Sequence, residues 1–381
     1  MPTIISGSRA TAATLGINAD RRVVEMHPRV MQLDPDAAPL VIFTSMLNKR
    51  SVGNPVFKTL EDEKVPTIDR VNNSGGYTAS ATSVTVDNGG YFGVNTLVRV
   101  QRTNEVMLVT AIATNALTVT RSFGGTAAAA LLDNDQLQIL GGAAIEGTTA
   151  ELSRTTKTST NTNYCQIFRW PFDLTNTDIE SNVYGEKELS YQQRKGLVEI
   201  KSVIEMAFLW GEAIENTGGN TPRRSTGGID NFISTNATNF GGGFNLPTFY
   251  SAMEDLMRHG SQSKLLFVGR SVNSNISLEA INHLEVTSKE KSFGMSIKSL
   301  ETPHGRALIK PHPLMEGDTY KKYGLVVDAA NVGFRSLTNR DVKLKTNVQA
   351  NDADKRTDEY VGEVGLWRSL EKTHGRFTNA A

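Results

Sequence analysis

The residues best suited to metal chemistry are the six histidines, and their spacing argues against a metal site. They are His27, His259, His283, His304, His312 and His374. None belongs to an H-E-x-x-H motif, and no two lie four apart on a segment expected to be helical. His304 and His312 could form a metal pair, but three prolines interrupt the segment that carries them. We therefore expect no metal site.

Motifs for nucleotide or nucleophilic chemistry are also missing. The sequence has no G-x-S-x-G elbow, no P-loop and no dinucleotide fingerprint. Residues 241–243 are glycines without a following Lys-Ser/Thr pair, so they predict a turn or hinge. Cys165 is the single cysteine, and no basic partner is expected beside it, which favours a buried thiol. We expect no catalytic residues and no cofactor, and hence no enzyme.

Two sets of charged residues are the candidate binding residues. The first lies between two expected strands and has the composition of a calcium loop, but it lacks the glycine and ligand spacing of an EF-hand. Its mixture of acids and bases instead predicts ion pairs between subunits. It contains Asp352, Asp354, Lys355, Arg356, Asp358 and Glu359. The second set lies on an extended segment that we expect to contact a neighbouring subunit, and it contains Glu146, Glu151, Arg154 and Lys157.

Phe168, Trp170 and Phe172 alternate along one segment, as in a stacking platform for nucleic acid. Only Arg169 adds a positive charge nearby, so local packing is the favoured interpretation. The whole chain has 40 basic and 40 acidic residues, so no global field draws it to nucleic acid or an anionic membrane. Neither a signal peptide nor a membrane-spanning segment is expected.

The elements that would position these residues begin with an N-terminal arm and a short helix within residues 1–55. The helix is expected over residues 37–47, capped by Asp36. Residues 56–75 and 143–175 read as two extended, polar limbs. Between them, residues 76–142 carry short alternating runs separated by turn signals, which predicts an inserted β-barrel-like module. Its strands are expected at 83–86, 97–101, 105–110, 116–121 and 136–140.

The two limbs would form a polar hairpin that is not stable alone in water. It becomes stable if it lies along a neighbouring subunit. The alternative is a disordered linker, because stretches rich in Ser, Thr and Asn often have that role.

A long amphipathic helix is expected over residues 185–216, within a domain formed by residues 176–217 and 338–375. Its apolar stripe would run from Leu189 to Ile214, and Glu205 would belong to its charged face. Residues 218–337 predict an α+β domain, with helices at 249–258 and 276–284 and strands at 264–268 and 323–328. Strands at 342–349 and 360–370 would follow, and the tail from Glu371 would be loose.

This order of parts resembles the HK97-fold major capsid proteins of tailed bacteriophages, with their N-arm, E-loop, spine helix and A-domain. Within that fold the chain is similar to the SU10-type major head proteins, in residues 296–312, 324–328, 332–337 and 363–366. The resemblance implies an α+β HK97-like capsid fold. The module at 76–142 is absent from the simplest members.

The resemblance also implies a function. Such a chain would self-assemble into hexamers and pentamers of an icosahedral shell around double-stranded DNA, without sequence-specific binding. Its partners would be copies of itself, a portal protein and a separate scaffolding protein, with assembly in the host bacterial cytoplasm. The alternative is a phage tail protein or secreted β-rich adhesin that binds host glycans.

Overall fold

The computed structural model describes residues 38–147, 154–181, 186–216, 218, 221–283, 289–292 and 295–380. They fall into two units: the body, Met1–Thr59 with Asn161–Ala381, and the insert, Leu60–Thr160. The described residues do not include the expected arm up to residue 35, nor Asp36, the expected cap of the short helix, nor Glu151.

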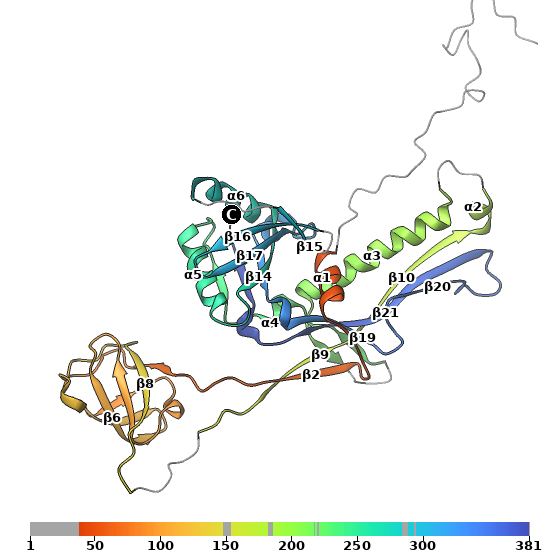
Figure 1. Cartoon of the computed structure of the whole chain (residues 1–381). Coiled ribbons are helices and arrows are strands. Elements are labelled where there is room, and N and C mark those ends of the chain that lie inside the picture. Colours follow the sequence, from red (N-terminus) through yellow and green to blue (C-terminus); the bar gives the residue numbers. More distant parts are fainter. Residues whose placement is uncertain are drawn as a thin grey trace, which may run out of the picture. The chain divides into compact units, whose positions relative to one another are not determined.

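The body is organised around helix α3 (Glu188–Trp210), which packs on one face of a sheet (Figure 1). The central strand β21 (Lys355–Arg368) pairs antiparallel with β10 (Gln166–Thr175) on one side. On the other side it pairs with β19 (Val332–Leu337) and β20 (Lys343–Lys345), and β1 (Lys49–Val52) adds a parallel edge. Phe168, Trp170 and Phe172 pack into this core, so the expectation of local packing is confirmed.

Helix α3 is shorter than expected, because it ends at Trp210. A Cβ at Gly211 would lie 2.4 Å from the carbonyl oxygens of both Ala207 and Thr226. Only glycine therefore fits where these two backbone segments pass close to each other. The following residues form β11 (Ile214–Asn216), which pairs with β12 (Arg223–Ser225). Ile214 is consequently exposed instead of belonging to the apolar stripe.

A seven-stranded sheet forms the second half of the body, in the order β13-β22-β18-β14-β17-β16-β15. Helices α5 (Leu246–Met257) and α6 (Arg270–His283) lie beside this sheet (Figure 1). The strands are β13 (Ala237–Asn239), β14 (Ser263–Val268), β15 (Lys289–Ser292), β16 (Met295–Thr302), β17 (Gly305–Pro311), β18 (Gly324–Val327) and β22 (Gly375–Thr378).

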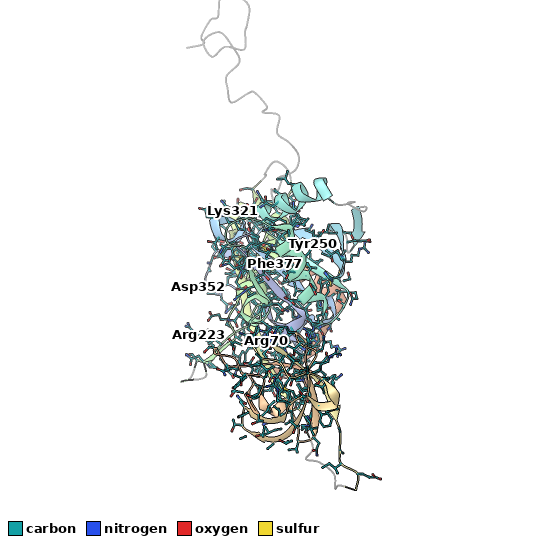
Figure 2. The ribbon with its side chains drawn as sticks, turned by 90° about the vertical axis from the view of Figure 1, so that its left-hand side faces the viewer. Arg70, Arg223, Tyr250, Lys321, Asp352 and Phe377 are labelled. Atoms are coloured by element: carbon teal, nitrogen blue, oxygen red, sulfur yellow. The ribbon has the colours of Figure 1, made fainter. Side chains whose placement is uncertain are left out.

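The tail that we expected to be loose is part of this sheet. Strand β22 lies between β13 and β18, and Phe377 is fully buried against Phe249 (Figure 2). The expectation failed because a short strand with one large apolar residue carries little periodicity. Short helices complete the body: α1 (Pro39–Leu47), α2 (Asn176–Glu180), α4 (Ile229–Phe232) and α7 (Gly317–Tyr320).

The insert is a closed barrel. Its sheet has the order β3-β8-β5-β6-β7-β4, and a bridge between Val71 and Val86 joins the two outer strands. The backbone N–H groups of Asn72 and Asp87 donate across this seam, at 2.9 and 3.1 Å. The strands are β3 (Ile68–Arg70), β4 (Ser83–Thr85), β5 (Thr96–Val100), β6 (Val106–Ala113), β7 (Ala116–Thr120) and β8 (Gln136–Gly142).

Each expected strand of the module is present, but the barrel begins earlier than residue 76. The sequence predicts the residues of β3 as part of the first extended limb, because three residues beside Pro66 give no alternating pattern. Its Asp69 is buried, and burial raises the pKa of that carboxyl above its usual value. The barrel core is lined by valines from both ends of the sheet, including Val84, Val98 and Val109.

A buried ion pair inside the barrel gives a test of this packing. Glu105 is fully buried, and Arg121 donates to both of its oxygens, at 2.7 and 2.8 Å. Arg121→Ala leaves this carboxylate without its charge partner and should lower the free energy of unfolding of the insert by about 3–5 kcal/mol. Urea denaturation measures this. The control Arg102→Ala removes a pair whose arginine is 44% exposed, and it should cost clearly less. Equal losses would contradict the packing.

Candidate assembly surfaces

The two limbs meet in a two-stranded ribbon of β2 (Val56–Glu61) and β9 (Ser159–Tyr164). Its base is bonded to the body. The Trp367 Nε1 donates to Thr59 Oγ1 at 2.8 Å, and Asn163 Nδ2 donates to the carbonyl oxygens of Gly227 and Leu366 at 2.9 and 2.7 Å. These bonds hold the base of the ribbon against the body.

Beyond its base the ribbon loses this support. Leu60 is 72% exposed, and Ser159 and Thr160 are exposed on the other strand. Asp62 follows in an exposed segment without regular structure, where its Oδ1 accepts from the backbone N–H of Glu63. A two-stranded sheet without a packing partner is marginal at best in water. The ribbon therefore presents strand backbone and an apolar side chain that its own chain does not cover.

The sheet face opposite α3 presents basic side chains over buried acids. Arg169 is 64% exposed and donates to Glu359, which is 6% exposed, at 2.5 Å. Lys345 approaches the same carboxylate from β20, at 3.9 Å. Arg340 pairs in the same way with Glu363 at 2.7 Å. Because the acids lie beneath and the bases outside, this basic face shows positive charge to the solvent.

The first set of charged residues, expected as a polar tip between two strands, is only partly a tip. Strand β21 begins at Lys355, so Asp358 and Glu359 lie inside the sheet and are buried. The Arg356 Nε donates to Asp358 Oδ1 at 3.0 Å, and Lys355 pairs with Asp173. These four residues thus have partners within the chain. The sequence-based expectation differs at these residues, because it has the strand begin at residue 360.

The exposed part of the tip is the turn that carries Asp352 and Asp354. Asp354 accepts from Asn176 Nδ2 at 2.5 Å, whereas Asp352 lies at the edge of the molecule (Figure 2). Of the second set, Glu146, Arg154 and Lys157 are exposed on the insert, and Arg154 donates to the carbonyl oxygen of Tyr91 at 3.2 Å. The two sets belong to different units of the chain.

A buried carboxylate that sequence reasoning placed on the surface joins three parts of the body. Glu205 of α3 is fully buried. Its Oε1 accepts from the backbone N–H of Leu40 and its Oε2 from that of Val41, each at 2.7 Å. These are the unpaired first donors of α1, which has no side-chain cap of its own. Glu205 therefore caps α1 from another helix.

His312, the residue directly after β17, completes this junction. Its Nε2 lies 2.6 Å from Glu205 Oε1, and its Nδ1 accepts from the backbone N–H of Leu314 at 3.2 Å. Since Nδ1 is an acceptor, Nε2 carries the hydrogen and donates to the carboxylate. A single acid inside the apolar run of residues 203–210 was the available sequence signal.

A second buried polar group ties the C-terminal strand to the sheet. Lys264 and Asp328 are both buried and pair at 2.9 Å, and Lys264 Nζ also donates to the carbonyl oxygens of His259 and Thr373. Burial lowers the pKa of Lys264. Burial opposes ionisation of Asp328 too, but donors led by the Ser261 N–H outweigh it and hold the pKa of Asp328 below its usual value.

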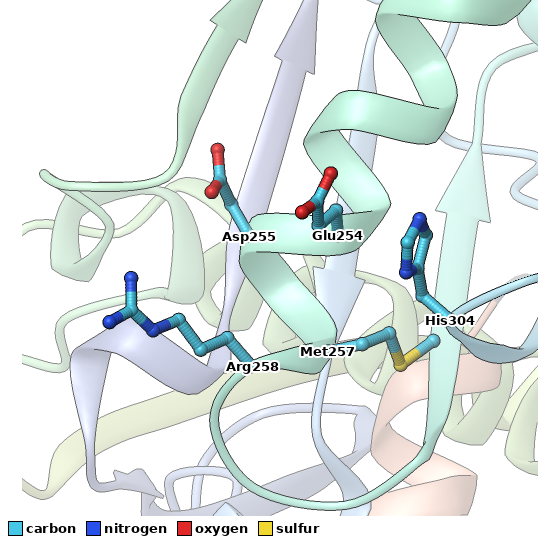
Figure 3. A pocket seen from close by; sticks show the side chains of 5 residues that line it. All are labelled: Glu254, Asp255, Met257, Arg258 and His304. Atoms are coloured by element: carbon cyan, nitrogen blue, oxygen red, sulfur yellow. The ribbon is translucent and has the colours of Figure 1, made fainter. Parts of the chain in front are cut away.

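One surface hollow is lined by acidic and basic side chains. It is about 360 Å³ and lies between α5 and the β16–β17 turn. Met257 reaches toward His304 with Glu254 on the same side, whereas Arg258 points away (Figure 3). All four polar residues that line it are exposed. Such an open site, with one histidine, does not assemble a reaction centre.

The thiol and the possible metal ligands of the described residues form no further site. Cys165 is buried, which confirms the expected buried thiol, and burial raises its pKa to about 12. No group of three or more His, Cys, Asp or Glu side chains in the described ranges could hold a metal ion. None of the helices described there has the length and hydropathy needed to cross a bilayer.

Comparisons with known proteins point in one direction. The model of the SU10 major capsid protein family matches residues 7–381. The major capsid protein of Pseudomonas phage PaMx41 is 25% identical over 293 residues, which cover 73% of this chain and 70% of that protein.

Solved structures share the fold at low sequence identity. The capsid of the native GTA particle has a TM-score of 0.53 at 9% identity, over 98% of this chain and 100% of that one. A chain in the structure of Microbacterium phage Oxtober96 has a TM-score of 0.52 at 7% identity, over 97% of this chain and 99% of that one.

The junction at Glu205 gives a stability prediction. Glu205→Ala leaves two backbone N–H groups and the His312 N–H without an acceptor, and each buried orphan costs about 1–3 kcal/mol. We expect the free energy of unfolding to fall by about 3 kcal/mol or more in urea denaturation. Glu199→Ala, on the same helix and half-buried, is the matched control and should change it by about 0.5 kcal/mol or less. A similar small loss for Glu205→Ala would contradict the capping role.

The buried His374 gives a pH prediction. It is fully buried, and burial lowers its pKa to about 4 from the ordinary 6.5. Between these values the unfolded chain binds a proton that the folded chain does not, so stability falls as pH falls through this window, by roughly 3 kcal/mol at most. His374→Gln removes this titration.

The measurement is the urea midpoint at pH 7 and at pH 4.5. The drop between the two should be smaller in His374→Gln than in the unchanged protein, whatever the variant does at pH 7. An equal drop in both proteins would contradict the buried neutral imidazole.

Proposed function

This chain belongs to the SU10 major capsid protein family and is a phage major capsid protein, and from that premise we propose how its copies hold one another. The ribbon of each copy lies over the body of the next copy, which supplies the strand partners and the covering surface that it lacks. The observation that carries this proposal is the exposed distal part of the ribbon, with Leu60 72% exposed. Nothing in the fold or the comparisons favours the adhesin alternative.

The proposed seat of the ribbon is the basic face of the neighbouring body. The acids Glu61, Asp62 and Glu63 follow one another where the ribbon turns into the insert. The seat offers Arg169, Arg340 and Lys345 above their buried acids, and Lys343 is exposed beside them. The acidic region of one copy attracts the basic face of another, whereas two acidic regions or two basic faces repel each other. The charges therefore favour contact between the ribbon and the basic face. Such pairs define the register of the ribbon more than the strength of binding.

The assembly that follows is a closed shell of rings. Each copy gives one ribbon and receives one, which is a head-to-tail contact that closes when the rotation between copies allows it. We propose hexamers and pentamers, with the turn of Asp352 and Asp354 where rings meet. Glu146, Arg154 and Lys157 remain proposed contacts of the insert. Because each contact recurs in every copy, modest contacts add up to a stable shell.

The remaining partners follow from the role of a shell. We propose that the shell encloses double-stranded DNA without reading its sequence, which suits a chain of zero net charge. A portal protein and a separate scaffolding protein are proposed as assembly partners in the host cytoplasm. We propose that the chain acts as a structural protein without a catalytic role or cofactor.

A charge exchange tests the seat. Lys343→Glu and Asp62→Lys each place like charges together at the proposed contact, and each should lower the yield of closed shells several-fold in negative-stain images. The two changes combined restore opposite charges and should recover much of the yield. Lys195→Glu, an equal change on the exposed part of α3, is the control and should assemble normally.

Two failures are distinguishable in this experiment. Normal shells from each single variant, or no recovery in the double variant, would reject the basic face as the seat. An unchanged protein that forms no rings or shells under any condition would reject the assembly itself.

A further inference from the structure

The last turns of α3 expose an apolar stripe on the side away from the sheet. Val203 is 41% exposed and Met206 is 47% exposed, and Trp210 continues the same face one turn later. The ring of Trp210 lies 4.5 Å from that of Tyr320, which is 40% exposed. The earlier turns of this helix face carry polar residues, including Gln192 and Lys195. The apolar stripe is therefore confined to one end of α3.

We propose that residues 23–33 of the same chain lie on this stripe. Six of these eleven residues are apolar, and they are Val23, Val24, Met26, Val30, Met31 and Leu33. No other eleven-residue stretch of the segment 1–37 has so many large apolar side chains, counting Val, Ile, Leu and Met. Burying them on α3 removes apolar surface of both partners from water.

The place where the segment joins the body supports this occupant. The chain enters α1 at Ala38, and the N–H groups of Leu40 and Val41 bind Glu205, the residue next to Met206. A helix with its side chains is about 10–12 Å across, so half its circumference is roughly 15–20 Å. An extended chain covers that distance in about six residues. Residues 23–33 can thus reach the stripe directly from Ala38.

Trp210 supplies an independent observation. Its Nε1 is buried and has no hydrogen-bond partner. A buried tryptophan N–H normally finds an acceptor. A peptide that lies along the stripe brings carbonyl oxygens, and a small shift of the ring would give this donor a partner.

Limited trypsin digestion tests the seat without requiring shell formation. Arg29 lies in the middle of the proposed segment, and docking should protect the bond after it. The double variant Val203→Glu, Met206→Glu makes the stripe acidic and should speed this cleavage at least tenfold, followed by mass spectrometry. Leu278→Glu, at a residue of α6 that is 61% exposed, is the matched control and should leave the rate unchanged.

The variant must remain folded for this comparison to count, and slow cleavage of the body reports that in the same digest. The milder Met206→Ser should accelerate cleavage after Arg29 to a smaller degree. Equal cleavage rates in the unchanged protein and both stripe variants would overturn the proposal.

A disulfide identifies which chain supplies the segment. Cysteines placed at Val30 and Met206 should form a disulfide within one chain, because docking brings them together. The native Cys165 is buried and should not compete. A monomer with altered mobility in non-reducing electrophoresis is the expected result. Dimers and ladders would mean that the arm of another copy, and not its own, covers the stripe. No disulfide at all would also reject the seat.

Discussion

A strand pair that lacks a third strand or a packing face cannot hold its shape in water, and this constraint governs the molecule. The described structure fixes the base of the ribbon with bonds from Trp367 and Asn163 and leaves its distal part exposed. The insert does not need that support, because its six strands close on themselves and bury their own core. The strand backbone beyond Thr59 is the part that we propose a second copy completes.

A contact between copies transmits force only if the body that receives it is rigid. Two buried polar junctions provide this rigidity. Glu205 holds α1, α3 and the segment of His312 together, and Lys264 with Asp328 holds the sheet against the loop before β22. Each is fully satisfied, as buried charge requires. The basic face stands on the sheet of β10, β20 and β21, and it keeps a positive excess because Arg169 and Lys345 share the single carboxylate of Glu359.

The sequence was informative where periodicity was strong and uninformative where one distant contact decided. The barrel strands and α3 follow from alternation and from the apolar stripe. The end of α3 at Gly211 could not be predicted, because it depends on the carbonyl of Thr226, which approaches from a separate segment. Glu205 looked like a surface acid because its partners lie on α1 and at His312. Lys355 to Glu359 looked like a tip because the pairing of β21 with β10 carries no local signal.

Hydrogen exchange of the ribbon backbone is the most direct test of the central claim. The amides of the distal ribbon, residues 60–61 and 159–160, and of the adjoining segments 62–64 and 154–158 are compared between unassembled chains and closed shells, with the barrel strands of the same protein as an internal reference. The account predicts fast exchange in the free chain and at least a hundredfold slower exchange in the shell, while the barrel strands stay unchanged. Equal exchange in both states would contradict the claim that neighbouring copies complete the ribbon.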